Sequence, residues 1–125
     1  MTKALLKILF SLLILLFVST TFTSCEKAND TTGIIKVVNS SGQVMSGVTV
    51  ILDQQNTIPG TDPIEDLRRS GTTDATGKAS FIYTYEAILD VNVNKNSGNN
   101  TYSGSGVIRL VRGKTEQITV EAVKQ

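Results

Sequence analysis

The chain has 125 residues and a formal net charge of +1, and it contains no histidine, no tryptophan and one cysteine. This inventory excludes imidazole general bases, disulfides within the chain and the usual zinc ligand sets. Acidic and basic residues are interspersed without a basic block, so the sequence carries no electrostatic footprint for nucleic acid.

The N-terminal segment has the pattern of an export signal. Lys3 and Lys7 supply positive charge ahead of the apolar run from Ile8 to Val18. A membrane-spanning helix needs about 20 apolar residues, and this run is shorter and flanked by polar groups. We therefore expect residues 1–24 to be a cleaved signal peptide, with an uncleaved membrane anchor as the alternative.

The end of this segment, Phe22-Thr23-Ser24-Cys25, resembles the lipobox of bacterial lipoprotein precursors, although Phe22 stands where an aliphatic residue is usual. The resemblance implies cleavage between Ser24 and Cys25 and attachment of acyl chains, palmitate among them, to Cys25. More than one chain is what stable membrane attachment requires. It also implies a bacterial cell envelope location, favouring the outer membrane at its periplasmic face or the cell surface, and no cofactor beyond this covalent lipid.

Residues 25–32 are expected to form the lipidated cysteine and a flexible tether, because they are poor in apolar groups. Within them, Asp30-Thr31-Thr32 resembles an O-glycosylation acceptor used on exported proteins by some bacteria, with Thr31 as the candidate site. The remaining residues, 33–125, have the length of one domain.

Short β-rich runs separated by turn residues follow from Gly33 onward. The predicted strands are Ile34 to Asn39, Val48 to Leu52, Ala79 to Tyr85, Ile88 to Val93, Tyr102 to Val111 and Gln117 to Val123. Apolar Leu89, Val91 and Val93 alternate with polar residues, which indicates a strand with one buried face. The pattern predicts an all-β antiparallel sandwich of about 6–7 strands.

Two stretches, 38–50 and 72–81, resemble parts of Ig-like modules in bacterial surface proteins. The first is a strand, a polar turn and then Gly47-Val48-Thr49-Val50; the second contains Thr73-Asp74-Ala75-Thr76-Gly77 before the next strand. They are similar both to invasin-type bacterial Ig-like domains and to carboxypeptidase-regulatory-like, transthyretin-like domains. Either resemblance implies a β-sandwich without implying an enzyme, and the choice between them stays open.

The long connection 54–70 is the predicted partner-binding loop, because connections of this length are usually functional or disordered. The residues expected to contact a partner are Pro59, Asp62, Pro63, Arg68 and Arg69. An insertion without a role is the alternative interpretation. We therefore expect a non-catalytic binding or structural accessory module, with an envelope protein or a glycan as its partner and no catalytic or metal-binding residues.

Three other functions are alternatives to this expectation. A calcium site would combine Asp74 with other acids of the chain, but the EF-hand spacing is missing. The acids that could join Asp74 are Asp53, Asp62, Glu65 and Asp66. A small hydrolase would need Glu65 and Asp66 to converge on one pocket. A carbohydrate-binding accessory of a glycan uptake system would use Tyr83, Tyr85 and Tyr102 as a stacking face, unless these rings simply pack on strands.

Overall fold

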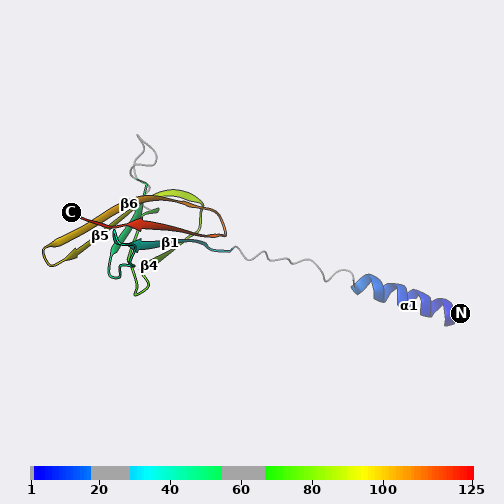
Figure 1. Cartoon of the computed structure of the whole chain (residues 1–125). Helices are drawn as coiled ribbons and strands as arrows, with labels where there is room; N and C mark the ends of the chain where they lie inside the picture. Colours follow the sequence, from blue (N-terminus) through cyan, green and yellow to red (C-terminus); the bar gives the residue numbers. More distant parts are fainter. Residues whose placement is uncertain (1, 18–28, 55–66) are drawn as a thin grey trace.

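The domain is an all-β sandwich of two sheets, described here from a computed structural model (Figure 1). The structure describes residues 2–17, 29–54 and 67–125. Its elements are α1 (Thr2–Phe17), β1 (Thr31–Val38), β2 (Thr49–Asp53), β3 (Arg69–Thr72), β4 (Lys78–Tyr83), β5 (Ala87–Ser97), β6 (Asn100–Leu110), β7 (Thr115–Glu121) and β8 (Val123–Lys124). The prediction of an all-β sandwich is confirmed.

The two sheets have the strand orders β4-β1-β7 and β3-β2-β5-β6-β8. Neighbouring strands are antiparallel except for β1 and β7, which run parallel. The chain changes sheets after β1, after β3, after β4, after β6 and between β7 and β8. The prediction of an antiparallel sandwich therefore holds for all but this one pair of the described strands.

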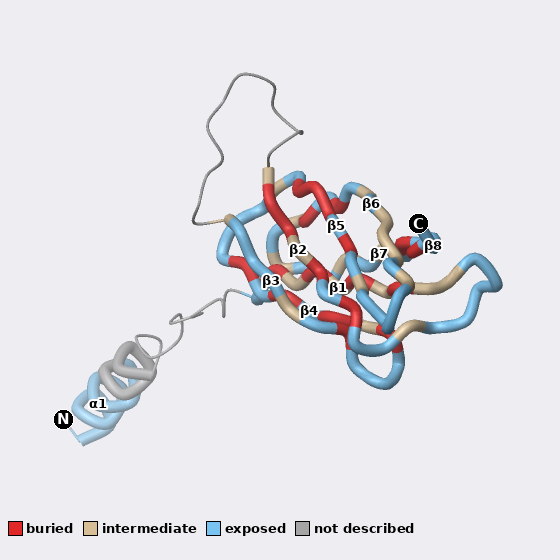
Figure 2. Tube along the Cα trace, turned by 90° about the vertical axis from the view of Figure 1, so that its left-hand side faces the viewer, coloured by how far each residue is buried: buried red, intermediate tan, exposed pale blue. Residues whose placement is uncertain are grey.

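The core lies between the sheets and is built by alternate residues of nearly every strand (Figure 2). Leu89, Val91 and Val93 all point inward, as their spacing predicts. The other buried apolar residues are Ile35, Val37, Val48, Val50, Leu52, Ala79, Phe81, Tyr83, Ile108, Leu110, Val120 and Ala122. Because the chain offers no disulfide, this apolar core is what stabilises the domain.

The sequence does not predict strand β3, because this strand lies at the end of the segment 54–70 that the pattern indicates to be a loop. Its residues, Arg-Ser-Gly-Thr, show no apolar alternation, and three of its four positions are exposed. It forms nevertheless because Arg69 to Thr72 pair in register with β2. At Gly71 a side chain would approach the ring of Phe81, since an added Cβ would lie 3.2 Å from its Cε1 atom.

The sheets come together at one side of the sandwich where β6 passes close to β7. A Cβ atom on Gly104 would overlap the carbonyl oxygen of Glu121, and one on Gly106 would lie 3.3 Å from Cγ2 of Val120. Only glycine permits so close an approach of two backbones. Immediately beyond, Val123 of β8 pairs with Ser103 of β6, so the C-terminal residues join the other sheet.

The connections divide between two ends of the sandwich. The entry end, where β1 begins, comprises residues 29–31, 67–69, 84–88 and 109–115. The far end comprises the turns at residues 39–47, 73–77 and 97–100. In Figure 1 the β6–β7 turn lies on the side from which β1 enters, and the β5–β6 hairpin tip and the C-terminus lie on the opposite side.

Candidate binding surface

Thr31 belongs to the sandwich and is its first strand residue. It is 1% exposed, its Oγ1 accepts a hydrogen bond from the amide of Gly113 at 3.0 Å, and the amide of Thr32 donates to the carbonyl of Lys114 at 2.9 Å. The expectation that Thr31 lies in an exposed tether is therefore wrong. Because its hydroxyl is buried, the folded domain leaves no room for a glycan there. Neighbouring Thr32 and Gly33, expected to end the tether and open the domain, also lie inside β1.

The segment before β3 packs on the end of β4 through Tyr83. The Tyr83 hydroxyl donates to the carbonyl of Leu67 at 3.2 Å, and the guanidinium of Arg69 lies 5.5 Å from the ring centroid. Burial raises the pKa of Tyr83 to about 12, and the positive charge of Arg69 acts in the opposite direction. This cation–π geometry fixes where the chain re-enters the sheet.

Of the predicted loop residues, the structure describes Arg68 and Arg69, and both are exposed. The Nη1 atom of Arg69 donates to the carbonyl of Arg68 at 3.0 Å. Pro59, Asp62 and Pro63 lie outside the described residues. The two arginines therefore stand at the entry end, beside the start of β1.

A second group of bases lies at the end of β6 and on the β6–β7 turn, at the same end of the sandwich. Arg109, Arg112 and Lys114 are exposed, and no acidic residue occurs between them. Gly113 has a φ of 69°, which lets the chain turn there, and a Cβ at this position would lie 3.5 Å from Asn29. The turn therefore sits directly beside the point at which the chain enters the domain.

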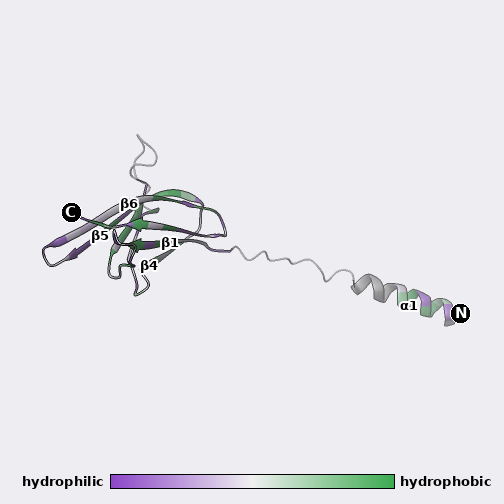
Figure 3. Ribbon diagram, in the orientation of Figure 1, coloured by the Kyte–Doolittle hydropathy of each residue, from purple (hydrophilic) through white to green (hydrophobic). Residues whose placement is uncertain are grey.

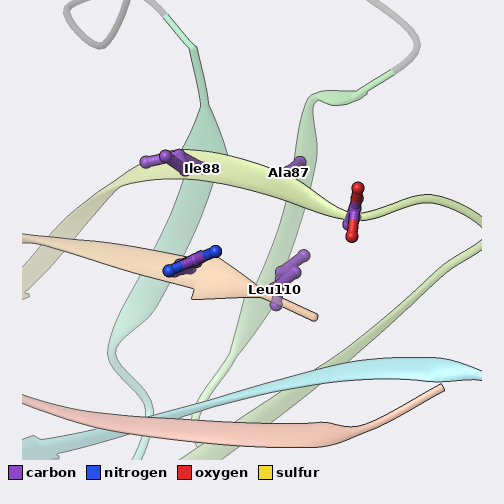
Figure 4. A pocket seen from close by; sticks show the side chains of 5 residues that line it. Ala87, Ile88 and Leu110 are labelled. Atoms are coloured by element: carbon purple, nitrogen blue, oxygen red, sulfur yellow. The ribbon is translucent and has the colours of Figure 1, made fainter. Parts of the chain in front are cut away.

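Apolar side chains are also uncovered around this end, and one of them, Ile88, pairs with Arg109. Tyr85 of the β4–β5 turn is 57% exposed, Ile82 of β4 is 63% exposed and Ile88 of β5 is 46% exposed. A hollow of about 210 Å³ opens between the start of β5 and the end of β6. Figure 4 shows Ala87 and Ile88 on β5 beside Leu110 on β6; Glu86 and Arg109 complete the lining.

Asp53 and Asp90 face each other across β2 and β5 and are 6% and 9% exposed. Their polar position in the alternation predicts solvated carboxylates, so sequence reasoning missed this buried pair; each takes part in an interaction in the structure.

The structure separates two acids of the calcium alternative, because Asp74 lies in a turn at the far end, away from Asp53. Among the described residues, no three acids, histidines or cysteines are grouped as metal ligands. Asp74 and Asp53 are thus not brought together, and the other acids of the calcium alternative, Asp62, Glu65 and Asp66, lie outside the described residues.

Asp74 instead closes the β3–β4 turn. Its Oδ1 accepts from the Thr76 hydroxyl at 2.6 Å, from the Thr76 amide at 2.8 Å and from the Lys78 amide at 3.1 Å. The hydrogen bond from the Thr76 hydroxyl, followed by those from the two amides, lowers the pKa of Asp74. This is a turn that satisfies its own polar groups.

The three tyrosines do not share a surface. Tyr83 is buried, Tyr102 is half-buried against the core and Tyr85 is exposed at the entry end. The interpretation that these rings pack on strands holds for Tyr83 and Tyr102. A continuous stacking face for sugars is absent from this set of residues.

Cys25 and Ser24 lie outside the described residues, as do Glu65 and Asp66. In the described part of the chain, no helix combines the length and apolar character needed to cross a bilayer. Helix α1 is nevertheless apolar, and its side chains Leu5, Leu6 and Leu9 are 60% to 72% exposed. The apolar surface that these residues present is therefore uncovered.

Comparison with known proteins finds no matching protein family and no matching curated protein. Among solved structures, the Bacillus anthracis TIE protein is similar, with a TM-score of 0.56 and 14% sequence identity. The match covers 77% of this chain and 17% of that protein, so this chain corresponds to a small part of it. At this identity the similarity shows the fold alone, a β-sandwich.

Proposed function

We propose that this chain is an envelope lipoprotein in which acylated Cys25 holds a non-catalytic β-sandwich beside a membrane. The observation that carries the proposal is the short connection: Thr31, six residues after Cys25, is already a buried residue of β1. The uncovered apolar side chains of α1 suit a segment that the secretion machinery binds and removes.

In this proposal the sandwich belongs to the Ig-like or transthyretin-like class, which the resemblance of segments 38–50 and 72–81 supports, and acts as a binding or structural accessory module of the outer membrane. Its partner surface includes Arg68 and Arg69, together with the loop residues Pro59, Asp62 and Pro63. Arginine side chains form charge-assisted contacts with carboxylates or phosphates. An envelope protein is the partner class that this surface suits.

The anchor is tested with Cys25→Ala. Acyl-chain labelling of the expressed protein is expected to disappear, because the variant lacks the sulfur that carries the lipid. Ser40→Ala, an exposed change in a turn of the far end, is the control and should label like the unaltered protein. Undiminished labelling of Cys25→Ala contradicts the proposal.

A carbohydrate-binding accessory is the second candidate, and the outer face of the five-stranded sheet favours it. Asn92, Asn94 and Asn96 are exposed on β5, opposite Ser105, Ser103 and Thr101 of β6. The Thr101 hydroxyl donates to Oδ1 of Asn96 at 3.1 Å. Such uncharged amides and hydroxyls match the hydrogen-bonding groups of a neutral glycan.

A glycan array tests this candidate. The double variant Asn92→Ala/Asn94→Ala is expected to bind its glycan roughly thirtyfold more weakly, because two hydrogen bonds of about 1 kcal/mol each are lost. Gln117→Ala/Thr119→Ala, two exposed positions on β7 of the other sheet, is the matched control. An array without any signal for the unaltered protein rejects the candidate.

A further inference from the structure

The chain that joins Cys25 to the sandwich is too short to separate the domain from a membrane. Six residues lead from Cys25 to Thr31, where β1 begins. Even fully extended, they span only about 20 Å. If Cys25 is acylated, as the proposed function holds, the entry end of the sandwich stays within that distance of the lipid headgroups.

The charges of the entry end suit such a neighbour. All four arginines of the chain, 68, 69, 109 and 112, lie there together with Lys114. The acids described at or next to this end are Asp30 and Glu86, which are exposed, Glu116, which is half-buried, and the buried pair Asp53 and Asp90, so the positive charge is concentrated on the β6–β7 side. The tip formed by Arg109, Arg112 and Lys114 is purely basic, and bases near an anionic bilayer are attracted to it.

The same end exposes the kind of apolar side chains found at membrane interfaces. Tyr85 is an amphipathic ring at a turn; Ile88 follows it on the outer face of the five-stranded sheet, and Ile82 precedes it on the outer face of the three-stranded sheet. Tyrosine is enriched at headgroup level because its ring is apolar and its hydroxyl stays hydrated. The far end has no exposed aromatic side chain among the described residues, and its hairpin tip is hydrophilic (Figure 3).

We propose that the entry end docks on an anionic phospholipid surface, with Tyr85 and Ile88 at headgroup level and Arg109, Arg112 and Lys114 beside the phosphates. The lipid anchor raises the local concentration of this surface at the bilayer, so weak contacts suffice to orient the domain. The far end then points away from the membrane.

The experiment uses the full acylated protein in vesicles of phosphatidylethanolamine and phosphatidylglycerol. Because the chain has no tryptophan, Tyr85→Trp introduces a single reporter at the entry end, and Ala75→Trp places the matched reporter in a far-end turn. Brominated lipids are expected to quench the tryptophan emission of the Tyr85→Trp protein and to leave that of the Ala75→Trp protein unchanged. Equal quenching of the two reporters overturns the docking.

The electrostatic part is tested in the Tyr85→Trp protein with Arg112→Gln/Lys114→Gln. Each base removed is expected to weaken the docked state roughly fivefold. Lys78→Gln/Lys124→Gln removes the same charge at the far end and should leave quenching unchanged. Docking is overturned if the two double variants behave alike, or if quenching of the entry-end reporter occurs only after an envelope protein is added to the vesicles.

Failure of the anchor gives a different result from failure of the docking. Protein that has an intact acyl mass and floats with vesicles, but shows no quenching of the entry-end reporter, retains the anchor and rejects the docking. Protein that has an unmodified mass and does not float rejects the anchor, and the docking with it.

Discussion

The two ends of the sandwich use their polar groups in opposite ways. At the far end, polar side chains form hydrogen bonds within the turns: Oδ1 of Asn39 accepts from the amides of Ser41 and Gln43, each at 2.9 Å. The buried hydroxyl of Thr73 accepts from the Val48 amide at 3.0 Å and donates to the Met45 carbonyl at 2.7 Å. These groups are satisfied by the fold itself.

At the entry end, Thr31, Tyr83 and Arg69 are used in this way. Arg109, Arg112 and Lys114 extend into solvent beside uncovered apolar side chains. Charged groups that the fold does not need are available for another molecule, whereas satisfied turn groups are not. The polar groups of the far-end turns are thus used by the fold, whereas the three bases of the entry end are the groups on which the proposed docking rests.

The largest effect should come from Gly77→Ala at the far end. Gly77 has a φ of 74°, and an added Cβ would lie 2.8 Å from Cβ of Val44 and 3.0 Å from the carbonyl oxygen of Val37. Backbone strain and overlap together are expected to lower the free energy of unfolding by about 3 kcal/mol, measured by urea denaturation.

Gly42→Ala separates these two causes. Gly42 has a similar φ of 79°, but no atom lies within 4 Å of an added Cβ, so only the backbone cost applies. That cost is about 1 kcal/mol. Equal losses in the two variants would show that the overlap of the added Cβ at position 77 with Val44 and Val37 adds no cost to that of the backbone.

The sequence predicts the far end well, because its turns are local. Asp74 and Gly77 mark the β3–β4 turn through hydrogen bonds and φ values that span a few residues. Apolar alternation likewise predicts the inward faces of most strands, since a strand with one buried face has a period of two. Propensity and patterning therefore account for the sandwich and for most of its core.

The sequence predicts the entry end poorly, because its contacts are long-range. The Thr31 hydroxyl accepts a hydrogen bond from the amide of Gly113, 82 positions away, and the Tyr83 hydroxyl donates to the carbonyl of Leu67 across the sheets. Arg69 begins a strand only because β2 offers an edge to pair with. No local sequence pattern predicts that Arg68 and Arg109 lie at the same end of the fold, because the strand topology determines this.

An intermediate effect is expected at the entry end from Tyr83→Phe. Removing the hydroxyl that donates to Leu67 should lower the free energy of unfolding by about 1 kcal/mol at pH 7. Urea denaturation of this variant and of Tyr85→Phe, whose ring is exposed, measures the difference. An equal loss in both variants would mean that the Tyr83 hydroxyl makes no net contribution.

Comparison of the unaltered protein with Tyr83→Phe at high pH tests the raised pKa of Tyr83. Its folded-state pKa of about 12 exceeds the ordinary tyrosine value of 10.0, so the neutral form is favoured by folding. This contribution is complete below about pH 10 and is lost as the pH rises toward about 12, because the unfolded tyrosine ionises first. Relative to Tyr83→Phe, the unaltered protein should lose about 1–2 kcal/mol of stability over this interval.

The smallest effect is expected at the far end from Asp74→Asn, which keeps the accepting oxygen of the turn and removes its charge. Hydrogen bonds from Thr76 and Lys78 lower the pKa of Asp74 below 3.8, so the carboxylate stabilises the fold above that pH. The contribution is lost as the pH falls through the lowered folded-state value, because the folded carboxylate must then bind a proton.

Stability of the two proteins, measured from pH 7 downward, should therefore show a small constant advantage of the unaltered chain that shrinks below about pH 4. An advantage that does not change with pH would assign the effect of Asp74→Asn to the shape of the turn. The negative charge of Asp74 would then contribute nothing to the stability of the folded domain, and the turn would depend on its hydrogen-bond geometry alone.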